Sequence, residues 1–127
     1  MKLNIDCVRD VLLEFETFPI GCYFVESFKK SIEHYDQETV LYVLVKLTEA
    51  NYINADYYRT EDGKIHFNDI LDITFQGHEF LEKIRSDTVW NQKLKPVFLS
   101  VGSMSFDVIS RVANSAITSL VLTKLGL

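Results

Sequence analysis

The segment from residue 37 to residue 81 constrains the fold more than any other part of the chain. Its first part has the apolar spacing of an amphipathic helix, with Val40, Leu44 and Leu47 on one face. Asn51 follows, at a point where a helix that ends in the left-handed conformation needs glycine or asparagine. The sequence therefore predicts a helix that stops near residue 50, with a sharp change of chain direction after it.

Two extended runs joined by a turn are predicted next. The first run starts at residue 52, and residues 61–64, Glu-Asp-Gly-Lys, have the composition of a tight hairpin turn. The second run ends at Ile73. Thr74 is then a suitable N-cap for an amphipathic helix that starts at Phe75. The segment as a whole predicts a helix, a β-hairpin and a second helix.

This order resembles the last helix and wing of the winged-helix superfamily. Three further runs resemble a family of small proteins from Gram-positive bacteria and their prophages, catalogued as a domain of unknown function. They are Met-Lys-Leu-Asn-x-Asp-x-Val-Arg-Asp at residues 1–10, Gly-His-Glu-Phe-Leu at 77–81 and Ile-Arg-x-Asp-x-Val-Trp at 84–90. With the apolar C-terminal segment, the resemblance covers nearly the whole chain. It implies an α+β, winged-helix-like fold with a β-hairpin wing and a prophage source, but no established activity.

The residues before the central helix depart from the winged-helix pattern. A first helix is predicted over residues 6–15, capped by Asn4 or Asp6, because apolar residues recur there at helical spacing. Residues 20–28 alternate in polarity and predict a strand, where a standard winged helix would have its second helix. Residues 28–35 leave room for a loop or for a helix of about two turns.

The C-terminal segment predicts a helical extension, so we divide the chain into a winged-helix-like domain, residues 1–90, and an extension, residues 91–127. Asp87 is a candidate cap, and Pro96 predicts either one kinked helix to about residue 101 or two short helices. A final helix is predicted over residues 105–125. Its polar residues argue against a membrane span.

One face of that final helix carries a wide apolar stripe. It consists of Phe106, Ile109, Val112, Ala113, Ala116, Ile117 and Leu120. Because leaving such a stripe in water is costly, we expect it to pack against a second chain as a symmetric homodimer. The alternative is docking within one chain, beside Trp90.

Charge is distributed unevenly along the chain. Residues 1–90 carry nine basic and seventeen acidic residues, a net charge of −8, whereas residues 91–127 carry four and one, a net charge of +3. An acidic domain is a poor electrostatic match for phosphates, which supply most nonspecific affinity for DNA. The charge therefore disfavours DNA binding even though the fold resemblance favours it.

The residue types associated with catalysis and metal binding show no matching pattern. The three histidines lack metal-ligand spacing, and the five glycines do not cluster into a phosphate-binding loop. We therefore predict no enzymatic activity, no metal site and no cofactor. Cys7 and Cys22 are too few for a disulfide framework and are expected to be small buried hydrophobes. With no apparent signal peptide, this indicates a cytoplasmic protein.

Two functions remain open from the sequence. The first is a non-enzymatic protein-interaction module of prophage origin, favoured by the acidic charge and by a central helix with few basic residues on its outer face. The second is a DNA-binding transcriptional regulator of the winged helix-turn-helix type, favoured by the resemblance in fold. If DNA is bound, the residues expected to contact it are Lys29, Lys30, Lys46, Arg59 and Lys64.

Overall fold

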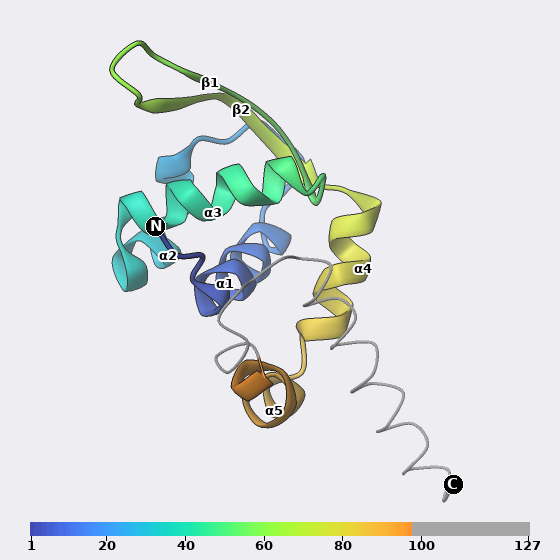
Figure 1. Ribbon diagram of the computed structural model, residues 1–127. Coiled ribbons are helices and arrows are strands. Elements are labelled where there is room, and N and C mark those ends of the chain that lie inside the picture. The colour runs from blue at the N-terminus through green and yellow to red at the C-terminus, as the bar shows by residue number, and fades with distance from the viewer. Residues whose placement is uncertain (98–127) are drawn as a thin grey trace, which may run out of the picture. The chain divides into compact units, whose positions relative to one another are not determined.

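The computed structural model describes residues 1–97 and has an α+β fold (Figure 1). One compact unit comprises Met1–His78, and a second begins at Glu79. The described elements are α1 (Ile5–Glu16), η1 (Val25–Ser27), α2 (Lys29–Tyr35), α3 (Gln37–Glu49), β1 (Ile53–Arg59), β2 (Ile65–Ile73), α4 (Phe75–Ile84), α5 (Asp87–Val89) and η2 (Trp90–Leu94). The helix predicted over residues 105–125, with its apolar stripe, lies outside the described residues.

Helix α1 forms the first side of the core, as its apolar spacing predicts. The Asn4 side chain caps it, because its Oδ1 accepts a hydrogen bond of 3.0 Å from the Cys7 N–H. Val8, Val11 and Leu12 are buried on one face. Each such side chain contributes about 1.5–3 kcal/mol by leaving water, so this face fixes α1 against its neighbours.

Helix α3 is the central element of the first unit, and it contacts α1, α2, η1 and β1. Asp36 caps its start, since Oδ1 accepts a hydrogen bond of 2.7 Å from the Thr39 N–H. Three consecutive residues, Val43, Leu44 and Val45, are buried. Consecutive helical residues point about 100° apart, so α3 is covered on most of its circumference and presents only a narrow outer stripe.

The end of α3 follows the sequence signal closely. Asn51 takes the left-handed conformation, with φ 62°, and its N–H donates to the Thr48 carbonyl at 3.0 Å. The Tyr52 N–H donates to the Leu47 carbonyl at 2.9 Å. These two bonds satisfy carbonyls that the last helical turn leaves open, and they direct the chain into β1.

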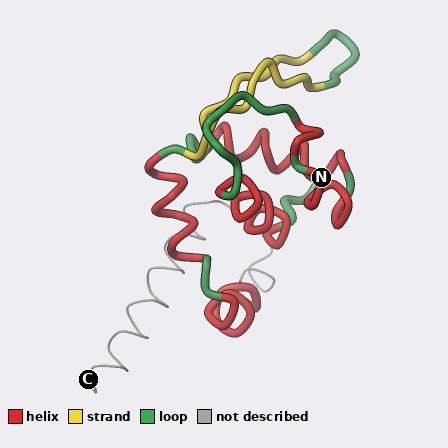
Figure 2. Tube along the Cα trace, turned by 180° about the vertical axis from the view of Figure 1, so that it is seen from behind, coloured by secondary structure: helices red, strands yellow, loops and turns green. Residues whose placement is uncertain are grey.

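Strands β1 and β2 form the predicted antiparallel hairpin, whose tip projects beyond the helices of the first unit (Figures 1 and 2). Gly63 adopts φ 84° in the turn, and the Thr60 N–H donates to the Lys64 carbonyl at 2.9 Å. The register shifts between Asn54 and Ala55 and again between Asp56 and Tyr57. Each shift marks a bulge that leaves one extra residue on β2.

The prediction of a strand over residues 20–28 is wrong. Only Tyr23 pairs with the sheet, through two backbone hydrogen bonds to Ile70 of 2.8 and 3.1 Å, and the short helix η1 follows. The Tyr23 ring turns inward against Phe15 and Phe18, with centroids 6.2 and 4.7 Å away. Directly after this bridge, the Phe24 N–H donates to the Ser27 Oγ at 3.0 Å and η1 begins. Cys22, predicted to be buried, is exposed there.

Residues 28–35, predicted as a loop or a short helix, form the seven-residue helix α2. Helix α4 starts as predicted, because the Thr74 Oγ1 accepts a hydrogen bond of 2.9 Å from the Gly77 N–H. The helix after it is capped by Ser86 rather than by Asp87, since the Ser86 Oγ accepts from the Val89 N–H at 3.3 Å. Ser86 precedes the first helical residue and therefore has the extended backbone that an N-cap needs.

The helix containing Trp90 continues through Pro96 as far as the described residues extend. In η2 the Lys95 N–H donates to the carbonyl of Trp90, five residues back. A wider turn of this kind relieves the clash of a proline ring with the carbonyl four residues earlier. Trp90 and Leu94 are buried. Within the described part of the chain, no helix has the length and hydropathy to cross a membrane.

Candidate functional site

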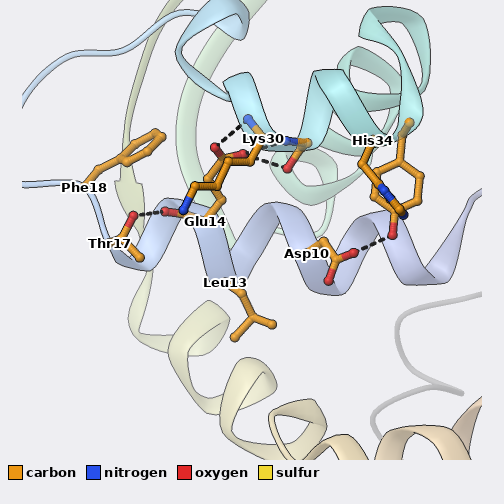
Figure 3. A pocket seen from close by; sticks show the side chains of 9 residues that line it. Asp10, Leu13, Glu14, Thr17, Phe18, Lys30 and His34 are labelled. Carbon is orange, nitrogen blue, oxygen red and sulfur yellow. Dashed lines mark hydrogen bonds between the residues drawn. The ribbon is translucent and has the colours of Figure 1, made fainter.

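A cavity of about 390 Å³ lies between α1 and α2 (Figure 3). Asp10 and Glu14 line it from α1, and Lys30, Ser31 and Tyr35 line it from α2. It contains both acidic and basic groups, so its chemistry depends on which of these groups are already engaged in holding the fold.

Glu14 joins the two helices. Its carboxylate accepts hydrogen bonds from the backbone N–H groups of Lys30 and Ser31, both 3.0 Å, and from the Ser31 hydroxyl at 2.7 Å. These N–H groups belong to the open first turn of α2, where a negative charge is favourable. Glu14 therefore acts as the cap of α2.

Tyr35 and Asp10 form the second link between these helices. The Tyr35 hydroxyl donates to the Asp10 carboxylate at 2.5 Å, and the His34 ring lies edge-on to the Tyr35 ring, with centroids 4.5 Å apart. Burial, the hydrogen bond to Asp10 and nearby carboxylate charges raise the pKa of the Tyr35 hydroxyl. A phenol held neutral in this way is a structural donor rather than a proton-transfer group.

Cys7, in the same helix as Asp10, has little nucleophilic character. Burial, and then the charges of Asp10 and Asp36, raise the pKa of its thiol to about 12. Because the thiolate is the nucleophile, Cys7 is a small buried hydrophobe, as predicted. Among residues 1–97, no three or more His, Cys, Asp or Glu side chains are placed to hold a metal ion.

The outer side of the hairpin has a different character. The two bulges give β2 a spacing of three, so Phe67, Ile70 and Ile73 point inward while the residues between them point outward. We call the resulting outer surface the acidic face. It consists of Asn54, Asp56, Tyr58, His66, Asn68, Asp69, Leu71 and Asp72, with Phe24 beside it.

Carboxylates oppose one another on the acidic face. Asp56 and Asp69 are direct cross-strand partners, and like charges in that position are destabilising. The Asn68 amide donates to Asp56 at 2.8 Å, and the Asn54 amide donates to Asp72 at 2.6 Å. These amides orient two of the carboxylates without neutralising them, so the face remains negatively charged.

Large apolar side chains are exposed on the same surface. Phe24 is 55% exposed and Leu71 is 43% exposed. The extended backbone of Phe24 follows Tyr23, whose ring points into the core, so Phe24 points to the opposite, outer side. A hollow of about 300 Å³ lies between the hairpin and the end of α3, and Leu71, Asp56 and Asp69 are among the residues that line it. Exposed apolar groups around a hollow are typical of a binding surface.

The five residues predicted to contact DNA lie on three separate parts of the first unit. Lys29 and Lys30 are exposed at the start of α2, and Arg59 and Lys64 are exposed beside the hairpin turn. Lys46, on the outer stripe of α3, forms an ion pair of 3.0 Å with Glu49 and lies 5.3 Å from the centre of the Tyr42 ring. Glu49 raises the pKa of the Lys46 ammonium. The proposed role in DNA contact stays a prediction.

Two comparisons place the chain in a family. Residues 2–102 match the family described as "Hypothetical protein (DUF2513)", so the chain belongs to this family of uncharacterised proteins. An uncharacterised protein of Haemophilus influenzae is 34% identical over 122 residues, which are 94% of this chain and 98% of that protein. No solved structure matches the chain. Membership of an uncharacterised family is confirmed, whereas the Gram-positive and prophage source stays a prediction.

Proposed function

We propose that this protein is a non-enzymatic protein-interaction module of prophage origin with a winged-helix fold, and that its acidic face is the binding surface. The observation that carries the proposal is the exposure of Phe24 and Leu71 beside the opposed carboxylates of Asp56 and Asp69. Such a face costs stability in the isolated chain. A partner that covers the apolar groups and complements the charges offsets that cost.

The order of elements supports the winged-helix part of this proposal. Helix α1, the Tyr23 bridge, α2, α3 and the β1–β2 hairpin follow one another in the winged-helix order. Helix α2 supplies a second helix where the sequence left a short helix or a loop, and the Tyr23 bridge lies in the segment that the sequence predicted as a strand. The order of elements is therefore compatible with the winged-helix superfamily. Because a fold does not determine a function, the function has to be argued from the residues on the surface.

The cavity between α1 and α2 supports the non-enzymatic part. Its two carboxylates have structural partners, because Glu14 caps α2 and Asp10 accepts from Tyr35. Chemistry at a site requires groups aimed at a substrate rather than at the fold. Here the carboxylates of Glu14 and Asp10 hold two helices together.

A capture experiment tests the proposal. The full chain carrying Phe24→Ser and Leu71→Ser is expected to lose a binding partner that the wild-type chain retains from a cell extract. The matched control is Phe75→Ser, which removes an aromatic ring that is 79% exposed at the start of α4 and lies outside the acidic face. Equal capture by all three proteins would contradict the assignment of the binding surface.

DNA binding is the second candidate, and the exposed Arg59 and Lys64 at the hairpin tip favour it. Fluorescence polarisation with random duplex at low salt separates the two functions. We expect a dissociation constant weaker than about 10⁻⁴ M, outside the usual nonspecific range. Tighter binding that is lost when Lys29, Lys30 or Arg59 is changed to alanine would favour the DNA-binding regulator.

We further propose that the chain is cytoplasmic and forms a homodimer through the apolar stripe of residues 106–120. Light scattering at micromolar concentration is expected to give twice the chain mass of 14.7 kDa. Glutamate at Ile109 and Leu120 places charges in the stripe and is expected to restore the monomer. A wild-type monomer would contradict the dimer without affecting the acidic face.

A further inference from the structure

We infer that the acidic face binds a cationic polypeptide segment that carries at least one large apolar side chain between basic residues. This inference rests on the proposed function and names the chemistry of the partner. It follows from the charge of the face, from the apolar side chains exposed on it and from the partners that this charge excludes.

The negative charge of the hairpin favours a partner with positive charge. Residues 53–73 contain five acidic and two basic residues, a net charge of −3, within a first unit that carries fourteen acidic and seven basic residues over residues 1–78. Complementary charge favours association and speeds encounter, whereas like charge opposes both. A cationic segment relieves the repulsion between Asp56 and Asp69, which the register places opposite each other.

The same charge argues against three other occupants. Nucleic acid and anionic lipid surfaces both carry negative charge, so they are repelled by this face. A second copy of the chain that packed through the same face in a symmetric dimer would oppose its own Asp56 and Asp69. A basic segment of another polypeptide meets none of these penalties.

The apolar residues define the rest of the partner. Leu71 lines the hollow of about 300 Å³ between the hairpin and the end of α3, together with Asp56 and Asp69, and Phe24 is exposed on the outer side of the hairpin. The exposed side chains of Leu71 and Phe24 offer contacts to an aliphatic or aromatic side chain of the partner, while the carboxylates of the acidic face pair with lysine or arginine on either side of it. Apolar anchors supply affinity and flanking charges supply orientation.

The test uses the full chain and three short synthetic peptides labelled with a fluorophore. One combines lysine, leucine and serine, one replaces lysine by glutamate, and one replaces leucine by serine. The chain is used as wild type, as Asp56→Asn with Asp69→Asn, and as Glu33→Gln with Glu38→Gln. Both double variants have a net charge of −3, the −5 of the wild type plus two, and Glu33 and Glu38 are exposed and outside the acidic face.

We expect the lysine–leucine peptide to bind the wild type, with an affinity that falls as salt is added. The Asp56/Asp69 variant is expected to bind about fivefold more weakly or worse, while the Glu33/Glu38 variant binds like the wild type. The peptide without leucine is expected to bind more weakly than the lysine–leucine peptide. Asparagine preserves the size of aspartate, and circular dichroism verifies that both variants fold.

Several results would overturn the inference. If both double variants bound the lysine–leucine peptide equally weakly, binding would depend on total charge and not on the acidic face. If no peptide bound, the inference of a cationic partner would be wrong. The glutamate–leucine peptide could instead bind the wild type and lose that binding in the variant Phe24→Ser with Leu71→Ser. This result would reject the cationic partner but keep the proposed function. Binding of random duplex DNA without any peptide binding would instead reject the proposed function itself.

Discussion

At the scale of single residues, the backbone carbonyl of Tyr52 leaves no space for a side chain at position 77. It accepts the Thr74 N–H at 3.0 Å, and a Cβ placed on Gly77 would lie 2.0 Å from the same oxygen. The glycine in the sequence therefore marks a close approach of α4 to the residue that directly precedes β1. The sequence signal at Thr74 identified the helix start, but only the fold shows why glycine follows it.

Gly77→Ala is expected to lower the free energy of unfolding by about 1–3 kcal/mol, because backbone atoms must shift to admit the methyl group. Urea denaturation followed by circular dichroism measures this difference. His78→Ala, at the neighbouring exposed position, is the control and should change stability by less than about 0.5 kcal/mol. Equal effects of the two substitutions would contradict the close approach.

Tyr35 gives the fold a dependence on alkaline pH. Its pKa is raised in the folded chain, so its contribution to stability is fully present below the unfolded pKa of about 10 and is lost as pH rises through the folded pKa. Tyr35→Phe is expected to cost about 1–2 kcal/mol near pH 7, through loss of the bond to Asp10. The difference from wild type should shrink above about pH 10. Urea titrations at both pH values test this, and a difference that grows with pH would contradict it.

At the scale of elements, α2 depends on a residue from another helix. A seven-residue helix has little stability of its own. Glu14 of α1 supplies three hydrogen bonds to its first turn. Helices α1 and α3 differ from α2, because each has its own apolar residues at helical spacing and a side-chain cap at its start. Helix α2 is held by a tertiary contact.

Glu14→Ala is therefore expected to destabilise the chain by about 1–3 kcal/mol, since it leaves backbone N–H groups of α2 without an acceptor. Glu14→Gln retains an acceptor oxygen and should recover part of the loss. Glu33→Ala, at an exposed position on α2, is the control for helix propensity. Hydrogen exchange at Lys30 and Ser31 should accelerate in Glu14→Ala alone; unchanged exchange there would contradict the capping role.

For the hairpin, the acidic face predicts a substitution that increases stability. Asp69→Asn removes one of two like charges that the register places opposite each other, and it should stabilise the chain by about 0.2–1 kcal/mol. The gain should diminish as salt screens the repulsion. Thermal unfolding at low and high salt measures both effects. A loss of stability at low salt would show that Asp69 has a structural partner in the fold.

These elements differ in how far the sequence could predict them. The caps at Thr74 and Asn51 and the turn at Gly63 are local, because the residue type alone determines the backbone, and they were predicted correctly. The strand over residues 20–28 was not, since alternating polarity cannot distinguish one bridge from a full strand. The acidic face was missed because two bulges shift the alternation of β2. Glu14 was missed because its partner is 16 residues away.

At the scale of the whole molecule, the order of the elements and the chemistry of the surface point to different functions. The order of elements is compatible with the proposed winged helix, yet the five basic residues predicted to contact DNA are spread over α2, α3 and the hairpin tip. The acidic face, in contrast, combines charge with exposed apolar groups. A winged-helix frame is thus proposed to present a protein-binding surface on the outer side of its hairpin. The family and its Haemophilus influenzae relative carry no described activity that decides between these uses.

Mapping the binding surface by NMR tests this account most directly. Amide shifts of the isotope-labelled full chain are followed during separate titrations with the lysine–leucine peptide and with random duplex DNA. We expect the peptide to shift the amide signals of Phe24, Asp56, Asp69 and Leu71, and we expect DNA to cause no saturable change. Saturable shifts at Lys46, Arg59 and Lys64 with DNA, and none on the acidic face with the peptide, would contradict it.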